Sequence, residues 1–122
     1  MIERIAYTAY PCRDVARTRA WYESVLELTF AGAYEENGVE TYNEAHLGDG
    51  AFSLMSAAYA EREPGSASSI VFEVRDIDEA AKLLEARGVA IEGRFDGPVC
   101  RQVSISDPDG NKVTLHQKTQ SG

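Results

Sequence analysis

The sequence predicts an α+β fold in which two βαβββ modules form a curved eight-stranded mixed sheet around a cleft. Residues 7–15 and 69–77 match at an offset of 62, and each is a short apolar strand followed by Arg-Asp and a helical pattern. Residues 49–56 and 109–117 match at an offset of 61 once one residue is gapped. Two sheets of about four strands, each backed by one helix, are expected to associate so that their remaining faces are covered.

Two helices of about three turns are predicted, one after each Arg-Asp pair. Asp14 and Asp76 stand at N-cap positions, where a carboxylate accepts hydrogen bonds from free backbone N–H groups. After Asp76 the apolar residues recur at three- and four-residue steps, and Gly88 supplies a left-handed stop. The buried stripe predicted for the first helix consists of Val15, Trp21, Val25 and Leu28.

The remaining strands follow from alternation and from turn residues. Residues 39–47 and 101–106 alternate as half-buried strands do, and Asp-Pro-Asp-Gly at 107–110 is typical of a tight turn. The predicted organisation is one domain, 1–122, made of a first module (1–60), a linker rich in Gly, Pro and Ser (61–68) and a second module (69–118).

Composition excludes several classes of partner. Twelve basic residues against twenty acidic ones give a net charge of −8, which argues against nucleic-acid binding because that needs a basic face. No apolar run reaches the length of a membrane span, so no membrane partner is expected. The first ten residues lack the pattern of a secretion signal, so Cys12 and Cys100 are expected to be reduced thiols in a cytoplasmic protein.

Three segments, 4–28, 70–89 and 106–117, resemble the vicinal oxygen chelate superfamily, which includes glyoxalases, bleomycin-resistance proteins and extradiol dioxygenases. They are distributed from residue 4 to residue 117 of the 122-residue chain. The resemblance implies the glyoxalase/bleomycin-resistance fold, a homodimer, and an active cleft inside the curved sheets. It leaves the function open, because members include metal lyases, isomerases, dioxygenases and drug-binding proteins without chemistry.

The resemblance also identifies the positions that hold a metal in some members. Metal-using relatives draw a ligand from the first strand of each module, typically His, and from the last, typically Glu. The matching residues here are Tyr7, Ser53, Ser69 and Thr114. All four carry neutral hydroxyl groups, which bind divalent cations weakly compared with imidazole or carboxylate. We therefore expect no metal site and no cofactor.

Strand alternation gives a further set of residues that face the cleft. The set combines aromatic side chains with a few polar groups, which is how small-molecule pockets are usually built. The predicted ligand-binding residues are Tyr7, Tyr42, Glu44, His46, Ser53, Met55, Ser69, Glu73, Gln102, Thr114 and His116.

The leading functional prediction is a metal-free protein that binds a small organic ligand, aromatic or cationic, as bleomycin-resistance proteins do in antibiotic resistance. The acidic charge favours a cation. The alternative is a lyase, isomerase or dioxygenase, with His116, His46 and Glu44 as candidate catalytic residues. It would use either a displaced divalent metal held by these residues and Glu73 or a metal-free His/Glu acid–base pair. A third possibility is an interaction module whose cleft is filled by its own side chains.

Overall fold

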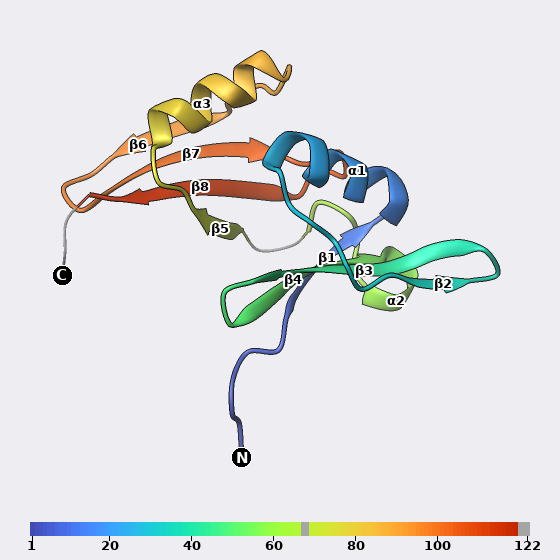
Figure 1. The fold of residues 1–122 in the computed structure, drawn as a ribbon. Coiled ribbons are helices and arrows are strands. Elements are labelled where there is room, and N and C mark those ends of the chain that lie inside the picture. The colour runs from blue at the N-terminus through green and yellow to red at the C-terminus, as the bar shows by residue number, and fades with distance from the viewer. Residues whose placement is uncertain (67–68, 120–122) are drawn as a thin grey trace. The chain divides into compact units, whose positions relative to one another are not determined.

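The computed structural model describes residues 1–66 and 69–119. Residues 67 and 68, the last two of the predicted linker, lie outside the described residues, as do 120–122. The chain divides into two compact units, Met1–Ala67 and Ser68–Gly122 (Figure 1).

The elements of the two units follow nearly the same order. The first unit contains β1 (Thr8–Cys12), α1 (Val15–Leu26), β2 (Tyr34–Glu36), β3 (Val39–Leu47), β4 (Gly50–Ser56) and the short helix α2 (Ala57–Ala60). The second contains β5 (Ile70–Glu73), α3 (Ile77–Ala86), β6 (Gly93–Asp96), β7 (Cys100–Ser106) and β8 (Lys112–Lys118). The two predicted βαβββ modules are therefore confirmed, and α2 is an addition that the sequence did not reveal.

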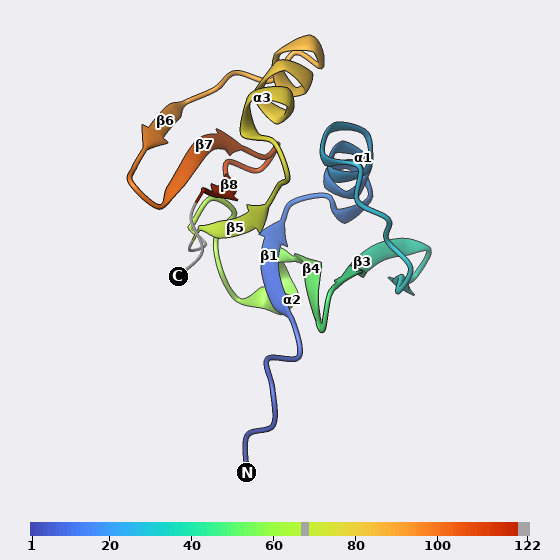
Figure 2. The same ribbon diagram turned by 60° about the vertical axis from the view of Figure 1, so that its left-hand side comes forward.

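Each unit forms its own four-stranded mixed sheet, and the two sheets have the same topology. The strand orders are β1-β4-β3-β2 and β5-β8-β7-β6. In each sheet the first strand runs parallel to the last one in sequence, and the other neighbours are antiparallel. One helix packs on one face of each sheet, α1 on the first and α3 on the second (Figures 1 and 2).

Helix capping follows the sequence closely. The Asp14 carboxylate accepts from the backbone N–H of Arg17 at 3.1 Å, and Asp76 accepts from those of Asp78 and Glu79, each at 3.1 Å. Both predicted N-caps are confirmed. Gly88, just beyond α3, has φ +78°, a conformation that glycine adopts without steric cost.

The buried face of α1 differs from the prediction. The helix ends at Leu26, and Glu27 adopts a left-handed φ of 62°, so Leu28 is not part of it. The aromatic residue in the core is Tyr22, which is fully buried, whereas Trp21 is partly exposed. One residue is a 100° rotation about the helix axis, so this choice decides which ring meets the sheet. The buried residues of α1 are Val15, Thr18, Tyr22 and Val25.

The turn between β7 and β8 is the one that the sequence predicted. The Asp107 carboxylate accepts from the backbone N–H groups of Asp109 at 2.8 Å and Asn111 at 2.9 Å, and Gly110 has φ +82°. The turn fixes the pairing of β7 with β8, and with it the residues that share each face of the second sheet.

None of the helices within the described ranges, 1–66 and 69–119, is long and apolar enough to cross a membrane.

Candidate functional site

The first unit gathers predicted site residues on the sheet face opposite α1. Tyr42 pairs with Met55, and Glu44 pairs with Ser53, across the antiparallel strands β3 and β4. Directly paired residues point to the same face of a sheet, so these four side chains share one surface. The residues of β4 that alternate with them, Phe52 and Leu54, point to the other face and are buried in the core.

A hydrogen-bonded cluster lies at the centre of this face. The Tyr42 hydroxyl is 2.8 Å from Ser53 Oγ and 3.2 Å from Glu44 Oε2. Burial raises the pKa of Tyr42, and the neighbouring carboxylate of Glu44 raises it further, while the hydrogen bond with Ser53 lowers it. The phenol therefore remains protonated at neutral pH and is suited to binding a ligand rather than to removing a proton from it.

Two more predicted residues flank the cluster. The ring of Tyr7 lies edge-on to that of Tyr42, with centroids 6.0 Å apart and 47% of the residue exposed. His46 Nε2 is 4.0 Å from Glu44 Oε1, and its side chain is 68% exposed. The structure thus brings together all six residues predicted for the first module, namely Tyr7, Tyr42, Glu44, His46, Ser53 and Met55.

Sequence reasoning missed a glycine that shapes this cluster. The Ala31 N–H donates to the backbone carbonyl of Glu44 at 2.9 Å, which places Gly32 beside the Glu44 side chain. A Cβ added at Gly32 would lie 2.6 Å from Glu44 Cγ. The position therefore has no room for a side chain, and the only sequence signal was the glycine itself, in a segment that no motif covered.

The second unit gathers a separate group on the face of its own sheet. His116 in β8 pairs with Glu73 in β5 on one side and with Gln102 in β7 on the other. His116 Nδ1 is 2.5 Å from Glu73 Oε1, and the Lys118 backbone N–H donates to Glu73 Oε2 at 2.9 Å. The hydrogen bonds from Lys118 and then His116 lower the pKa of Glu73, so its carboxylate is ionised at neutral pH.

The remaining predicted residues of the second module are less closely associated. Thr114 pairs with Val71 and Ser104 and is nearly buried, at 7% exposure. Ser69 is exposed and immediately precedes β5. No hydrogen bond links either residue to the His116–Glu73 pair within residues 69–119.

The four positions that match metal ligands do not fit a divalent cation. Tyr7 and Ser53 belong to the first unit, and Ser69 and Thr114 to the second. Their donors are neutral hydroxyls, and that of Ser53 is fully buried and engaged by Tyr42. In the part of the chain that the structure describes, no three or more His, Cys, Asp or Glu side chains are placed to hold a metal ion. For the alternative metal site at displaced positions, each unit brings only two candidate ligands together. These are Glu44 with His46 in the first unit and Glu73 with His116 in the second.

The side chain of Arg101 forms ion pairs within the second unit. The Arg101 guanidinium donates to both carboxylate oxygens of Asp78 at 3.0 Å and to Asp96 at 2.7 Å. These ion pairs tie α3 to the edge of the sheet, on the face opposite His116. They also hold the pKa of Asp78 below its usual value.

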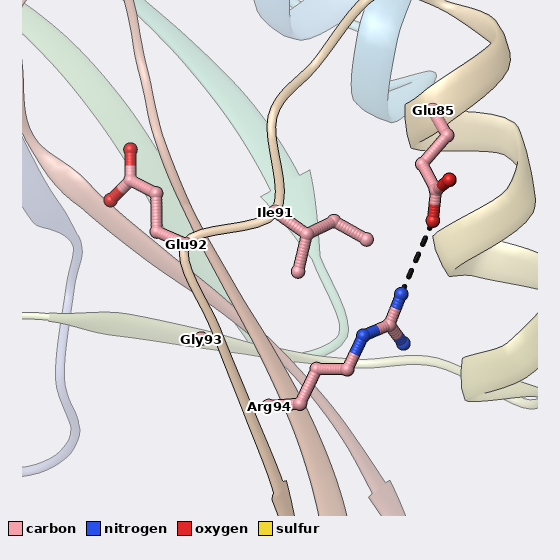
Figure 3. A pocket seen from close by; sticks show the side chains of 5 residues that line it. All are labelled: Glu85, Ile91, Glu92, Gly93 and Arg94. Carbon is pink, nitrogen blue, oxygen red and sulfur yellow. Dashed lines mark hydrogen bonds and ion pairs between the residues drawn. The ribbon is translucent and has the colours of Figure 1, made fainter.

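A shallow hollow lies elsewhere in the second unit, between α3 and β6 (Figure 3). Its charged groups are already paired, because Arg94 contacts Glu85 at 3.2 Å and Glu92 contacts Lys112 and Ser106. The other two lining residues are Ile91 and Gly93, and none of the predicted site residues belongs to this hollow.

Solved structures with the same fold include proteins of different activity. The antibiotic-binding protein TnmS3 from a Streptomyces species is 23% identical, with a TM-score of 0.84 over 97% of this chain and 98% of that one. A lactoylglutathione lyase from Agrobacterium tumefaciens is 21% identical, with a TM-score of 0.78 over 96% and 95%. A member of the glyoxalase/bleomycin resistance protein/dioxygenase superfamily from Sphaerobacter thermophilus is 24% identical, with a TM-score of 0.80 over 96% of this chain and 98% of that one.

At such identities the likeness establishes the fold, and the predicted glyoxalase/bleomycin-resistance fold is confirmed. No curated protein matches the sequence significantly. The model of one family, described as the Glyoxalase/Bleomycin resistance protein/Dioxygenase superfamily, matches residues 4–115. The chain belongs to that superfamily.

Proposed function

We propose that this protein binds an aromatic organic cation, without a metal, on the Tyr7–Tyr42–Glu44 surface of its first unit. The observation that carries the proposal is the Tyr42 phenol held between Ser53 and Glu44. Tyrosine rings attract a flat cation through their faces, and the carboxylate supplies the opposite charge. The Glu44 side chain is 27% exposed, so part of it is accessible to a ligand.

Two further observations support the proposal. The net charge of −8 favours the approach of cations over anions. The antibiotic-binding protein TnmS3 has the same fold, although a lactoylglutathione lyase also has it, so the fold alone does not choose between binding and catalysis. The neutral hydroxyls at the four positions that match metal ligands favour direct binding of an organic molecule.

Titration of the full chain with the cationic dye acridine orange, followed by fluorescence, tests this proposal. We expect saturable binding that Glu44→Gln weakens about tenfold, since one charge-assisted contact is worth roughly 1.5 kcal/mol. Glu36→Gln, which removes an exposed carboxylate of β2, is the matched control and should bind as the parent does. Equal weakening by the two variants, or no binding, would refute the proposal.

Elemental analysis of protein purified without chelator tests the absence of a metal. We expect less than about a tenth of an equivalent of Zn, Ni, Fe, Co or Mn, because high-affinity sites retain their ion through purification. A near-stoichiometric amount of any of these would instead support the enzymatic alternative. The homodimer that the resemblance implies is part of the proposal and is tested by sedimentation velocity.

One observation favours a second candidate, metal-free acid–base catalysis. The pair of His116 and Glu73, 2.5 Å apart, is the arrangement in which a carboxylate orients an imidazole for proton transfer. Turnover of a thiol adduct or a catechol by the metal-free protein, abolished in His116→Gln, would establish this function in place of ligand binding alone.

A further inference from the structure

Four side chains line up across the sheet of the second unit. Phe95 in β6 pairs with Gln102 in β7, Gln102 pairs with His116 in β8, and His116 pairs with Glu73 in β5. Paired residues point to the same face, so the four form one row from edge to edge of the sheet. We call this row the Phe95–Glu73 row.

The row lies on the face opposite α3. Arg101, which precedes Gln102 in β7, points to the other face, where it binds Asp78 at the start of α3. Arg94, which precedes Phe95 in β6, likewise contacts Glu85 of α3. Because alternate residues of a strand face opposite sides, Phe95 and Gln102 face away from the helix.

Glu73 determines which nitrogen of the His116 ring carries a proton. Both carboxylate oxygens accept hydrogen bonds, one from His116 and the other from the Lys118 backbone N–H. An ionised carboxylate has no proton to donate, so the Nδ1 that contacts it must be the protonated nitrogen. In the neutral imidazole the opposite nitrogen, Nε2, then carries a lone pair and accepts hydrogen bonds.

This acceptor is available to a ligand. Nε2 has no hydrogen-bond partner among residues 1–66 and 69–119. In the same part of the chain no fully enclosed side-chain nitrogen or oxygen lacks a partner, so Nε2 reaches solvent. The His116 side chain is 24% exposed, which leaves it partly sheltered by its neighbours.

Phe95 supplies an apolar surface at the other end of the row. The residue is 54% exposed on an edge strand, although burying its ring would be favourable. Gly97 lies against the ring: a Cβ added there would be 2.6 Å from Phe95 Cε2. The ring therefore lies directly over Gly97, and a larger residue at this position would require the ring or the segment to shift.

The spacing along the row suggests the size of the ligand. Phe95 and His116 are two strands apart, and neighbouring strands are separated by ~4.8 Å, so about 10 Å separates their backbones. A molecule of about two fused rings can therefore place a polar group at His116 and extend across Gln102 to the ring of Phe95.

We propose that the Phe95–Glu73 row binds a bicyclic aromatic ligand that carries a phenolic hydroxyl, with the hydroxyl donating to His116 Nε2 and the rings packed against Phe95. His116 is the ligand-contacting residue, and Glu73 is a positioning residue that acts through it. The inference goes beyond the proposed function, because it adds a second ligand class on a surface of the second unit, separate from the Glu44 surface of the first.

The protonation pattern of His116 can be measured without any ligand. The chain has only two histidines, so long-range ¹H–¹⁵N correlation spectra of the full chain at pH 8 contain two imidazoles, and His46→Gln assigns them. We expect His116 to carry its proton on Nδ1, the tautomer that free histidine disfavours. Glu73→Gln should shift the proton toward Nε2, whereas Glu79→Gln, which removes an exposed carboxylate of α3, should not. An Nε2-protonated ring in the parent would overturn the inference.

The ligand class is tested with the matched probes 2-naphthol and 2-methoxynaphthalene, in which a methyl group replaces the phenolic proton and removes the hydrogen-bond donor. At pH 8 we expect 2-naphthol to bind about tenfold more tightly, since one hydrogen bond to a ligand is worth that factor. The preference should disappear in His116→Phe and shrink in Glu73→Gln, and should persist in Glu79→Gln. Phe95→Ala should weaken both probes alike, because it removes the apolar contact and not the hydrogen bond.

The outcomes separate this inference from the proposed function. Equal affinity for the two probes, or no binding of 2-naphthol, overturns the Phe95–Glu73 row as a phenol site while acridine orange can still bind at Glu44. Loss of acridine orange binding with an intact preference for 2-naphthol would refute the proposed function and leave the row in place.

Discussion

Tyr42 and Ser53 lie on adjacent strands with their side-chain oxygens 2.8 Å apart, although the residue directly opposite Tyr42 is Met55. The bond directions follow from the third member of the cluster. The Glu44 carboxylate can only accept, so the Tyr42 hydroxyl donates to it and accepts from Ser53. Ser53 therefore orients the phenol that in turn restrains the carboxylate, and the three side chains act as one unit.

Removing the serine hydroxyl should change the ionisation of the phenol. In Ser53→Ala we expect the pKa of Tyr42 to rise further, because the hydrogen bond that lowers it is lost while burial and Glu44 still raise it. The free energy of unfolding should fall by about 1 kcal/mol. Ultraviolet absorbance titration of the phenolates, with Tyr42→Phe to identify the signal, measures the pKa, and Ser24→Ala on exposed α1 surface is the control. An unchanged titration would show that Ser53 does not donate to Tyr42.

A methyl group at position 32 should weaken ligand binding and also lower the stability of the fold. Gly32→Ala places a Cβ 2.6 Å from Glu44 Cγ, so the Glu44 side chain must shift from the position in which it contacts Tyr42. We expect acridine orange to bind several-fold more weakly, with a loss of stability of about 1–2 kcal/mol from overpacking.

Gly50→Ala is the matched control for this substitution. A Cβ at Gly50 meets nothing within 4 Å, so dye affinity should stay at the parental value. Parental affinity in Gly32→Ala as well would mean that the position of Glu44 does not govern binding.

The ion pair between Arg19 and Glu40 should make stability depend on acid pH. Arg19 Nε and Nη2 donate to the two oxygens of Glu40 at 2.8 and 3.1 Å, and Asn43 adds a third bond at 2.9 Å. Burial by itself raises the pKa of Glu40, but these hydrogen bonds together lower it below its usual value. A depressed pKa in the folded state stabilises the protein at pH values above the unfolded-state pKa of about 4.3, and this contribution is lost as the pH falls through the folded-state pKa.

Urea unfolding between pH 6 and pH 3 measures this contribution. We expect the free energy of unfolding of the parent to fall more steeply with acidification than that of Glu40→Gln, with a difference of about 1 kcal/mol for this partly buried pair. Glu36→Gln, an exposed carboxylate, should follow the parent curve. Parallel curves for the parent and Glu40→Gln would contradict the expectation.

The fold was predictable from the sequence because the chain repeats its local signals. Asp14 and Asp76 each follow an apolar strand and precede a helix, and each carboxylate caps its helix as the repeat indicates. Strand alternation then assigned Ser53 to one face and Phe52 to the other, because a period of two leaves a single choice once the buried face is known.

The parts of the site that were not predicted depend on contacts between strands. Gly32 matters only because β3 brings Glu44 beside it, and a glycine adds nothing to a hydrophobic pattern. Phe95 joins His116 through the pairing of three strands, which no local pattern in the sequence reveals. The link between His116 and Glu73 spans 43 positions of sequence and depends on the parallel register of β5 with β8.

Tyr22, rather than its neighbour Trp21, should carry the stability of α1. The two residues are adjacent and both aromatic, so hydrophobic periodicity alone did not determine which of them faces the sheet. The prediction that Trp21 belongs to the buried stripe was wrong. The Tyr22 ring is fully buried, and its centroid lies 5.1 Å from that of the Phe52 ring. Trp21 is partly exposed, and its ring lies edge-on to that of Tyr22.

We expect Tyr22→Ala to lower the free energy of unfolding by about 3–5 kcal/mol, the cost of a large cavity in a packed core. Trp21→Ala should cost only about 1–2 kcal/mol, because its side chain is partly exposed and its removal leaves a smaller cavity in the core. Tyr22→Phe, which keeps the ring, should retain most of the stability. Urea denaturation followed by far-ultraviolet circular dichroism measures all three, since it does not depend on the tryptophan. A greater loss in Trp21→Ala than in Tyr22→Ala would mean that α1 is rotated about its axis so that Trp21, and not Tyr22, faces the sheet.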